Sequence, residues 1–480
     1  MYIDSTRVTE LLKLFVSSKV QATRPKRAQS WWLLALTLAL QSVGLAEEAQ
    51  QQTPVQPLLV DTAVAIAIEN NPSLSEMQAR YEAMAEIPSQ LGTLPDPVVS
   101  LNALNLPTDT FNVGQEGMTQ MQVGLSQVMP FPGKLALQEG ASEYEAQAAG
   151  NSFDEMRLRL ISSTKSSWWQ LYYLDRALDV VASNQDLLRQ FVQVANTKYE
   201  VGDGLQQDTL LAQLELSKLF DQEIRLQAIR RNQAIQLNVL MDTPPDAVIV
   251  LPGKVSTFMP GLIDENRLYD RAETIRPLLR ERENYINAAQ SRLELAKKQY
   301  YPDFKLGLSY GDRSGDNPFP RSGQREDFLS VMLSANLPIY HKRKLDRAVS
   351  QRSIEVRKSR ESLRDKWAIV RSEISSASTD YLEAKELFVL FQDGIIPQAK
   401  QTVSSMLAGY QVNEVDFLNL VDSQVTLLNY EVQYWKALTD AKKALARLVS
   451  AVGEEEVTQW TAKSTQAIFP SGAINGSVDR

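Results

Sequence analysis

The side chains that most often perform chemistry in proteins are scarce or scattered in this chain of 480 residues. There is no cysteine and a single histidine, His341, which leaves no thiolate nucleophile, no disulfide and no multi-histidine metal cluster. His341 stands beside Lys342 and Arg343 at the end of a predicted strand, where an interfacial position is more typical than a metal ligand. The acidic residues are numerous, but no stretch groups them with a nucleophile, a base or a phosphate-binding loop. The sequence therefore predicts no enzyme, no cofactor and no metal site.

The overall composition excludes two further classes of protein. The formal net charge of −8 disfavours nucleic acid as a partner, because binding a phosphate backbone requires a basic surface. Hydrophobic residues make up 44% of the chain, enough to build a core rather than a disordered chain.

The N-terminus has the pattern of an export signal. Arg24, Lys26 and Arg27 precede the apolar run Trp31–Leu40, and the pattern ends at Gly44-Leu45-Ala46, a typical cleavage-site end. This run is too short to cross a bilayer as a helix, which needs roughly 20 residues. We therefore expect a signal peptide over residues 1–46 and a polar lead-in over 47–57; a buried N-terminal helix is the alternative.

One stretch of the chain occurs twice. The sequence YEVGDGLQQDTLLAQ at 199–213 is matched by YQVNEVDFLNLVDSQ at 410–424. Each copy interrupts a long helical pattern at Gly202 or Asn413, the residue types that most readily adopt the left-handed conformation that ends a helix. Asp203 and Glu414 follow, and we expect them in the first turn of the returning helix. The pattern predicts two helical hairpins; two unrelated αα-turns are the alternative.

The segments around these hairpins are also repeated. NNPSL at 70–74 corresponds to IRPLL at 275–279, LPDPVVSLN at 94–102 to YPDFKLGLS at 301–309, and GLSQVMPFP at 124–132 to MLSANLPIY at 332–340. We therefore predict two structural repeats, a crossover and a loose C-terminal tail. Their ranges are 58–242, 264–452, 243–263 and 453–480.

The predicted hairpins, 134–241 and 342–452, are unusually long. From Lys134 to Tyr199 there is no proline, and a continuous helix of that length would extend roughly 100 Å. Gly394 and Pro397 are expected to bend the corresponding helix of the second repeat. Helices of this length must lie along partners for most of their extent.

Four segments alternate between apolar and polar residues and predict strands at about 97–106, 119–129, 303–311 and 327–337. Their length suits a tilted strand that crosses a membrane, although a soluble hairpin packed on helices alternates in the same way. Lipid cannot satisfy an open sheet edge, and four strands are too few for a membrane barrel. If the strands enter a membrane, several copies must combine them. The predicted fold is mainly α with four strands.

With these features the chain resembles the TolC family of outer membrane efflux ducts, over about residues 58–452. The resemblance implies a homotrimer, in which duplicated α-hairpins form a periplasmic α-barrel and four strands per chain contribute to a shared 12-stranded outer membrane β-barrel. It also implies an exit duct of a tripartite efflux or type I secretion system in a Gram-negative outer membrane, with a periplasmic adaptor and an inner-membrane pump as partners. PFPGK at 130–134 and the preceding LPDP are similar to the branch that serves heavy-metal and other cation exporters.

The resemblance also suggests which residues close the duct at its periplasmic end. Tyr410, Asp422 and Asp208 match a Tyr and two Asp residues of the family's gate, while Asn419 replaces another Asp and Val415 replaces an Arg. Asn419 and Asp422 share a helix face, and a ring of Asp422 carboxylates would attract cations. With the Arg absent, we expect hydrogen bonds and packing to hold this gate more than ion pairs.

The two turns themselves correspond to the family's adaptor-docking tips. They comprise Val201, Gly202 and Asp203 in the first hairpin, and Val412, Asn413 and Glu414 in the second. A periplasmic helical adaptor or scaffold without a membrane barrel is the alternative function. Two hairpins and four amphipathic strands favour the duct, because adaptors of that kind carry one hairpin between lipoyl-like halves.

Overall fold

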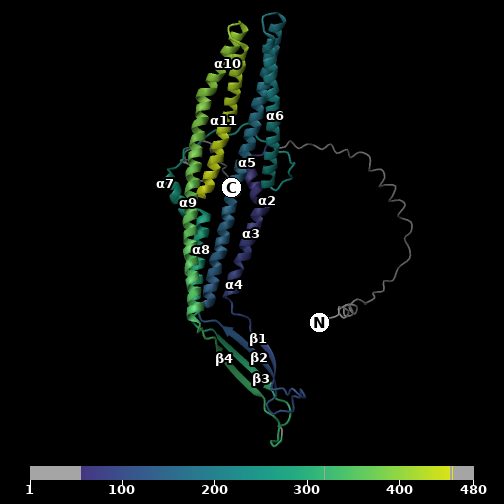
Figure 1. Cartoon of the computed structure of the whole chain (residues 1–480), viewed down its shortest axis with the longest axis vertical. Coiled ribbons are helices and arrows are strands. Elements are labelled where there is room, and N and C mark those ends of the chain that lie inside the picture. Colours follow the sequence, from purple (N-terminus) through teal and green to yellow (C-terminus); the bar gives the residue numbers. More distant parts are fainter. Residues whose placement is uncertain (1–55, 318, 455–456, 458–480) are drawn as a thin grey trace, which may run out of the picture. The chain divides into compact units, whose positions relative to one another are not determined.

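The computed structural model of the protein describes residues 56–317, 319–454 and 457, and the chain from Pro57 onward forms one compact unit. The predicted export signal and nearly all of the lead-in and the C-terminal tail lie outside the described residues. Long helices dominate this unit, and a sheet of four strands lies at one end of them (Figure 1). The expectation of a mainly α protein with a few antiparallel strands is confirmed.

The first repeat contains three short helices, two strands and a long helical hairpin, in that order. Its elements are α2 (Val60–Asn70), α3 (Pro72–Ala85), α4 (Ile87–Gly92), β1 (Val98–Leu104), β2 (Gln120–Met129), α5 (Lys134–Glu200) and α6 (Gln206–Leu240).

The second repeat follows the same order, except that a single helix corresponds to α3 and α4. Its elements are α7 (Glu265–Ile275), α8 (Pro277–Lys298), β3 (Phe304–Asp312), β4 (Phe328–Ala335), the π-helical turn η1 (His341–Leu345), α9 (Asp346–Leu390), the π-helical turn η2 (Phe391–Ile395), α10 (Ile396–Gln411) and α11 (Phe417–Val452). The interruption expected near Gly394 and Pro397 takes the form of η2, because a π turn accommodates one extra residue within a helix.

Asn71 fixes the start of α3 and joins it to the end of α6. Its side-chain oxygen accepts hydrogen bonds from the backbone N–H groups of Ser73 and Leu74, at 3.1 and 3.2 Å, which satisfies donors that a helix start leaves free. Its side-chain nitrogen donates to the carbonyl of Leu240 at 3.0 Å. The side chain of Asn71 therefore caps the start of α3 and also binds a free carbonyl at the end of α6.

Arg276 occupies the equivalent position before α8 and makes a different set of contacts. Its guanidinium donates to the carbonyl of Ser450, near the end of α11. It also binds Glu155 on α5 through two bonds of 2.8 and 2.9 Å. The side chains of Arg276 and Glu155 are only 3% and 6% exposed. The second repeat thus begins with a buried, bidentate ion pair to the first repeat.

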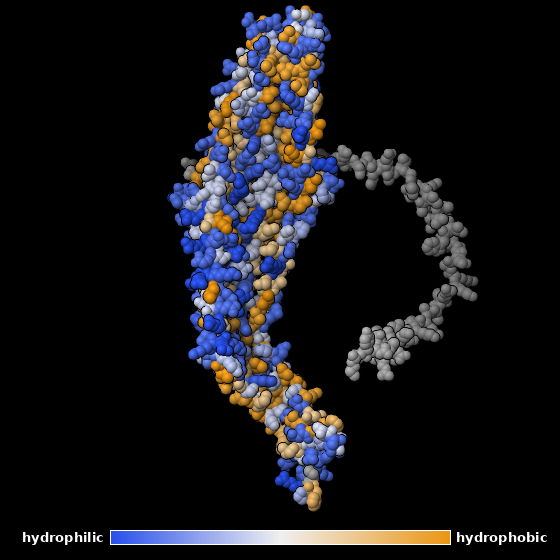
Figure 2. Space-filling model, in the orientation of Figure 1, coloured by the Kyte–Doolittle hydropathy of each residue, from blue (hydrophilic) through white to orange (hydrophobic). Residues whose placement is uncertain are grey.

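The four strands form one antiparallel sheet in the order β1-β2-β3-β4, which leaves β1 and β4 as its edges. The two β-hairpins, β1–β2 and β3–β4, have equivalent registers. Leu101 lies opposite Val123 in the first hairpin, and their repeat counterparts, Leu308 and Val331, lie opposite each other in the second. Apolar side chains gather over the surface of the sheet (Figure 2).

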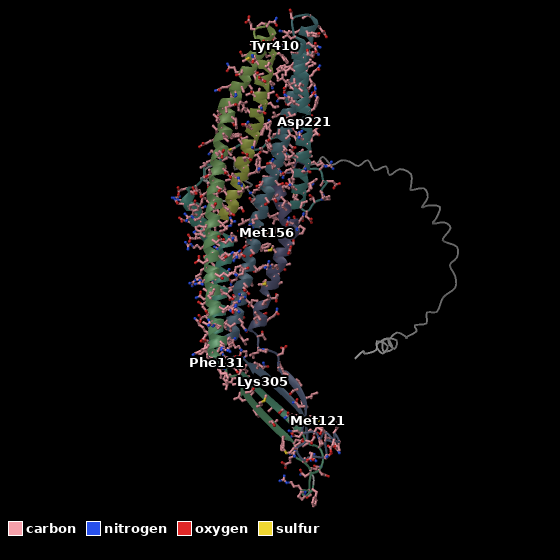
Figure 3. The ribbon with its side chains drawn as sticks, in the orientation of Figure 1. Met121, Phe131, Met156, Asp221, Lys305 and Tyr410 are labelled. Atoms are coloured by element: carbon pink, nitrogen blue, oxygen red, sulfur yellow. The ribbon has the colours of Figure 1, made fainter. Side chains whose placement is uncertain are left out.

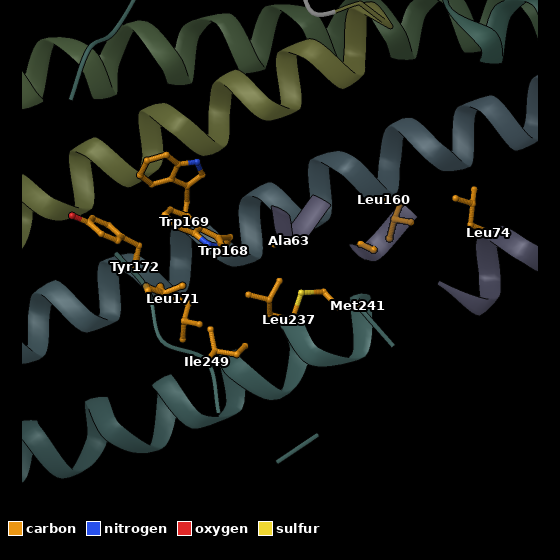
Figure 4. Close-up of a cluster of buried hydrophobic side chains, with 12 residues drawn as sticks. Ala63, Leu74, Leu160, Trp168, Trp169, Leu171, Tyr172, Leu237, Met241 and Ile249 are labelled. Atoms are coloured by element: carbon orange, nitrogen blue, oxygen red, sulfur yellow. The ribbon is translucent and has the colours of Figure 1, made fainter. Parts of the chain in front are cut away.

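The helix α5 is the central element of the unit and packs against α6, α8 and α11. Near its middle lies an aromatic group in which the rings of Trp168 and Tyr172 stack with centroids 5.7 Å apart and Trp169 meets Trp168 edge-on (Figure 4). The indole N–H of Trp168 donates to the carbonyl of Leu58 at 2.9 Å. This core joins the short helix α2 and the end of α6 to the long helix.

Candidate functional site

The two hairpin tips have the same backbone conformation. Gly202 and Asn413 both adopt positive φ, +82° and +63°, as the sequence predicts. The N–H of Asp203 donates to the carbonyl of Lys198 at 2.8 Å, and the N–H of Glu414 donates to the carbonyl of Gly409 at 2.9 Å. These bonds satisfy carbonyl groups that the helix ends leave free.

The expectation that Asp203 and Glu414 lie in the first turn of the returning helices is wrong. Helix α6 begins at Gln206 and α11 begins at Phe417, so both acids belong to the turns. The residue before each helix, Leu205 or Asp416, is extended. A left-handed residue reverses the chain only in part, and further non-helical residues are needed before the helix can start again.

Tyr410, at the end of α10, is the residue on which the two hairpins converge. Its side chain is buried and its hydroxyl donates to Asp208, in the first turn of α6, at 3.5 Å. Its ring packs against that of Phe417 with centroids 5.1 Å apart. Lys198 lies 4.4 Å from the centroid of the same ring and donates to the carbonyl of Tyr410 and to the side-chain oxygen of Asn413, both at 2.5 Å. Three polar contacts therefore connect the first hairpin to the second.

Burial raises the pKa of both side chains in the Tyr410–Asp208 hydrogen bond. Burial, the negative charge of Asp208 and the hydrogen bond raise the pKa of Tyr410 to about 12, so that its hydroxyl remains a donor at neutral pH. Burial is also the main cause of a raised pKa at Asp208; the charge of Asp416 adds to it, while the bond from Tyr410 and the charge of Lys198 oppose it. Asp208 is thus a carboxylate held where its charge is disfavoured.

A groove of about 930 Å³ lies beside this contact, between the two tips. Asp208 and Tyr410 line it together with Val415, Asp416 and Phe417. Val415, which stands where the resemblance leads us to expect an Arg, contributes an apolar wall to the groove. In the described chain, this site is held by hydrogen bonds and packing.

Asn419 and Asp422 do not join this group. Both side chains are exposed on α11, and among the described residues neither makes a hydrogen bond or an ion pair with Asp208 or Tyr410. The four residues suggested for the gate therefore separate into one contacting pair, Asp208 and Tyr410, and one exposed pair on the neighbouring helix.

Sequence reasoning missed several polar contacts between the hairpins, and two of the sites are notable. One is Lys198, whose counterpart in the second repeat is Gly409, so the repeat gives no signal for it. The other joins Gln424 on α11 to Asn184 on α5 through a side-chain hydrogen bond. Both amides are buried, at 3% and 5% exposure. The periodic placement of Asn184 and Gln424 within apolar helix faces was the available signal.

The outer ends of both tips are open to solvent. Val201 and Val412 occupy equivalent positions and are 67% and 66% exposed. Gly202, Asp203, Asn413 and Glu414 are exposed as well. A large apolar side chain at the same place in both turns presents a repeated contact surface.

At the other end of the helices, near Phe131 (Figure 3), an ion pair between a buried lysine and a half-buried aspartate fixes the junction with the sheet. Lys134, at the start of α5, is 3% exposed and binds Asp303 at 2.8 Å, just before β3. The backbone N–H of Phe131 donates to the same carboxylate at 2.8 Å. The rings of Phe131 and Tyr301 stack with centroids 4.5 Å apart. This junction links the end of β2 to the start of β3.

No group of three or more His, Cys, Asp or Glu side chains in the described part of the chain is placed to hold a metal ion. Among the same residues, no helix combines the length and the apolar character that a bilayer crossing requires.

Comparison with known families and curated proteins gives one match. The sequence model of a family described as outer membrane efflux protein matches residues 268–454, which is the greater part of the second repeat. No curated protein matches the sequence significantly.

Several solved structures with a similar fold are described as outer membrane proteins or channels. The outer membrane channel OprN has a TM-score of 0.69 at 17% identity, over 82% of this chain and 89% of that chain. VceC from Vibrio cholerae has a TM-score of 0.69 at 17% identity, over 83% and 97%. The open state of the MtrE channel from Neisseria gonorrhoeae has a TM-score of 0.69 at 16% identity, over 82% and 89%. At these identities the likeness shows a shared fold.

Proposed function

We propose that this chain is a member of the outer membrane efflux protein family, whose sequence model matches residues 268–454, and that three copies of it form a passive exit duct. Their strands combine into a 12-stranded barrel in the outer membrane, and their hairpins form a tunnel that extends into the periplasm. A periplasmic adaptor and an inner-membrane pump supply the substrate and the energy, in a tripartite efflux or type I secretion system. The duct performs no chemistry of its own.

The observation that carries this proposal is the sheet. All of β4 is exposed on both faces, and the two edges, β1 and β4, have no neighbouring strand among the described residues. An exposed apolar sheet with open edges is an aggregation hazard in water. In a membrane its apolar face contacts lipid, and further copies close its edges.

The helices support an assembly as well. Leu210, Leu214 and Ile224 lie along one face of α6 and are 57%, 53% and 68% exposed. Their spacing places them on a common stripe. A stripe of large exposed apolar side chains along a helix suits packing against a second copy of the chain.

For the gate we propose two contributions from the same end of the hairpins. Asp208 and Tyr410, with Lys198, hold the two hairpins of one copy together. Asn419 and Asp422 face the lumen of the assembled tunnel, where three Asp422 carboxylates attract cations and repel anions. The adaptor docks on the exposed tips, Val201–Asp203 and Val412–Glu414.

Asp208→Asn is expected to favour the closed duct at neutral pH and to abolish the pH dependence of closure. The raised pKa of Asp208 means that the closed tip binds a proton more readily than a solvated carboxylate does. Protonation of Asp208 therefore stabilises the closed tip fully at a pH below the ordinary carboxylate pKa. This stabilisation is lost as the pH rises through the raised pKa of Asp208. Asn cannot ionise, yet its oxygen still accepts the bond from Tyr410. Single-channel recording in planar bilayers between pH 4 and 7 measures this.

Asp203→Asn provides the control for this prediction, because Asp203 is an exposed acid in the adjoining turn. It should retain the wild-type pH dependence. If Asp208→Asn retains it too, another group titrates and Asp208 is not part of the gate.

The proposed duct is tested by fractionation followed by SDS-PAGE of unheated and boiled samples, with cross-linking to count the chains. A cross-linked band at three times the monomer mass, from the outer membrane fraction, is the expected result. A monomer or dimer in the detergent-free soluble fraction would instead identify the protein as a helical adaptor or scaffold, and its strands as ordinary hairpins.

A further inference from the structure

The edges of the sheet differ from its interior in the exposure of their apolar side chains. Leu308, on the inner strand β3, is 50% exposed. Leu101 on the edge strand β1 and Leu333 on the edge strand β4 are 78% and 71% exposed. Each edge residue lacks a neighbour on one side, so each edge has room for one more strand.

The sequence repeat specifies which strand fits there. Inside one chain, β2 of the first repeat pairs with β3 of the second repeat, and Leu125 lies opposite Leu308. The repeat counterparts of these residues are Leu333 on β4 and Leu101 on β1. The equivalent strand pair, in which the second repeat is followed by a first repeat, can therefore form only between two copies of the chain.

We propose that β4 of one copy pairs with β1 of a second copy in the register of the β2–β3 pair, with Leu333 opposite Leu101 and with Lys342 bound to Asp96. This proposal rests on the duct described above and specifies the interface that closes its barrel. The partner is a second copy of the chain, and the same contact repeats around the assembly.

The alternation of side chains agrees with this register. It places Val331 opposite Ala103 and Leu333 opposite Leu101, so that apolar residues face apolar residues across the new strand pair. On the other face it places Ser334 opposite Ser100. A slip of one residue would bring the apolar face of one strand against the polar face of the other.

The ion pair at the junction gives a second, independent argument. Lys134 corresponds to Lys342 in the repeat, and Asp303 corresponds to Asp96. Lys134 and Asp303 bind each other at 2.8 Å, whereas Lys342 and Asp96 are both exposed and have no ion pair or side-chain hydrogen bond within the described residues. Lys342, after β4, and Asp96, before β1, therefore lie at opposite edges of the sheet, and pairing with a neighbouring copy would bring them together.

The apolar part of the junction is repeated in the same way. The stacked pair Phe131 and Tyr301 corresponds to Ile339 and Leu94, which are 65% and 49% exposed. In the proposed interface these two aliphatic side chains pack beside the Lys342–Asp96 pair, as the aromatic rings do beside Lys134 and Asp303.

Engineered disulfides test the register, and the chain has no cysteine of its own to interfere. Directly opposite residues of an antiparallel pair lie about 4.5–5.5 Å apart at Cα, within the range of a disulfide. The variant Leu101→Cys/Leu333→Cys should give linked dimers and trimers on non-reducing SDS-PAGE of the full chain extracted from membranes. The control Leu101→Cys/Val331→Cys, shifted by two residues on the same face, should remain monomeric because its Cα atoms are too far apart.

Native mass spectrometry of the unlinked protein in detergent tests the trimeric duct separately from the strand register. A trimer in which only the shifted pair forms links, or in which neither pair does, overturns the proposed register and leaves the duct intact. A monomer overturns the duct itself, and with it this interface.

Charge exchange tests the ion pair. Asp96→Lys and Lys342→Asp should each lower the temperature at which the unheated trimer dissociates on SDS-PAGE, and the double variant should restore it. Lys344→Asp, an equal change of charge at an exposed neighbour of Lys342, should have little effect. If the double variant is no more stable than the single ones, the two residues do not meet.

Discussion

Arg276→Ala is expected to lower the free energy of unfolding by about 3–5 kcal/mol. The substitution leaves the carboxylate of Glu155 buried without its bidentate partner and also frees the carbonyl of Ser450. Glu155 then keeps only the largely exposed Arg159 as a partner, and a buried charge that has lost its buried partner destabilises a fold far more than an intact buried pair stabilises it. Thermal melting of the helical circular dichroism signal, in detergent, measures the loss.

The chain provides a matched control for this prediction. Arg159 binds the same carboxylate at 2.9 Å, but its side chain is 59% exposed. Arg159→Ala should therefore lower the free energy of unfolding by no more than about 1 kcal/mol. Equal losses from Arg276→Ala and Arg159→Ala would contradict the view that the burial of Arg276 makes its pair important.

Lys198→Met is expected to shift the duct toward its open state by about tenfold or more. Lys198 donates two hydrogen bonds from the first hairpin to the second, and a bond from a charged group contributes about 1.5–3 kcal/mol. Each 1.4 kcal/mol corresponds to roughly a factor of ten in an equilibrium. Methionine retains the apolar length of lysine while it removes the charge. The open probability of single channels in planar bilayers reports the shift.

Lys218→Met is the corresponding control. Lys218 lies on α6, is 61% exposed, and within the described part of the chain forms its ion pair with Glu215 on the same helix. Its removal changes the net charge equally but leaves every contact between the hairpins intact, so the open probability should stay at the wild-type level. An unchanged open probability in Lys198→Met would place the closing contact elsewhere on the hairpins.

The sequence predicts the elements of the fold better than the contacts between them. Gly202 and Asn413 could be identified because few residue types adopt positive φ, and the strands because their alternation is strict. The Arg276–Glu155 pair could not be foreseen, since its partners are far apart in sequence and charged residues are common on helices. At the tips, the resemblance suggested Asp208 and Tyr410 as gate residues, and the structure shows a hydrogen bond between them. Lys198 has Gly409 as its repeat counterpart, so the repeat gives no signal for it.

The hydrogen bond between Asn184 and Gln424 restricts how the hairpins can move past each other. A shift of α11 along α5 by one helical turn would separate the two amides by about 5.4 Å. Asn184 would keep its bond to the carbonyl of Val180, but the buried amide nitrogen of Gln424 would lose its acceptor, which is strongly unfavourable. Rotation or tilting about this point keeps them in contact. The Asn184–Gln424 bond therefore fixes the axial register of α5 and α11. The two helices can tilt or rotate relative to each other while that register is preserved.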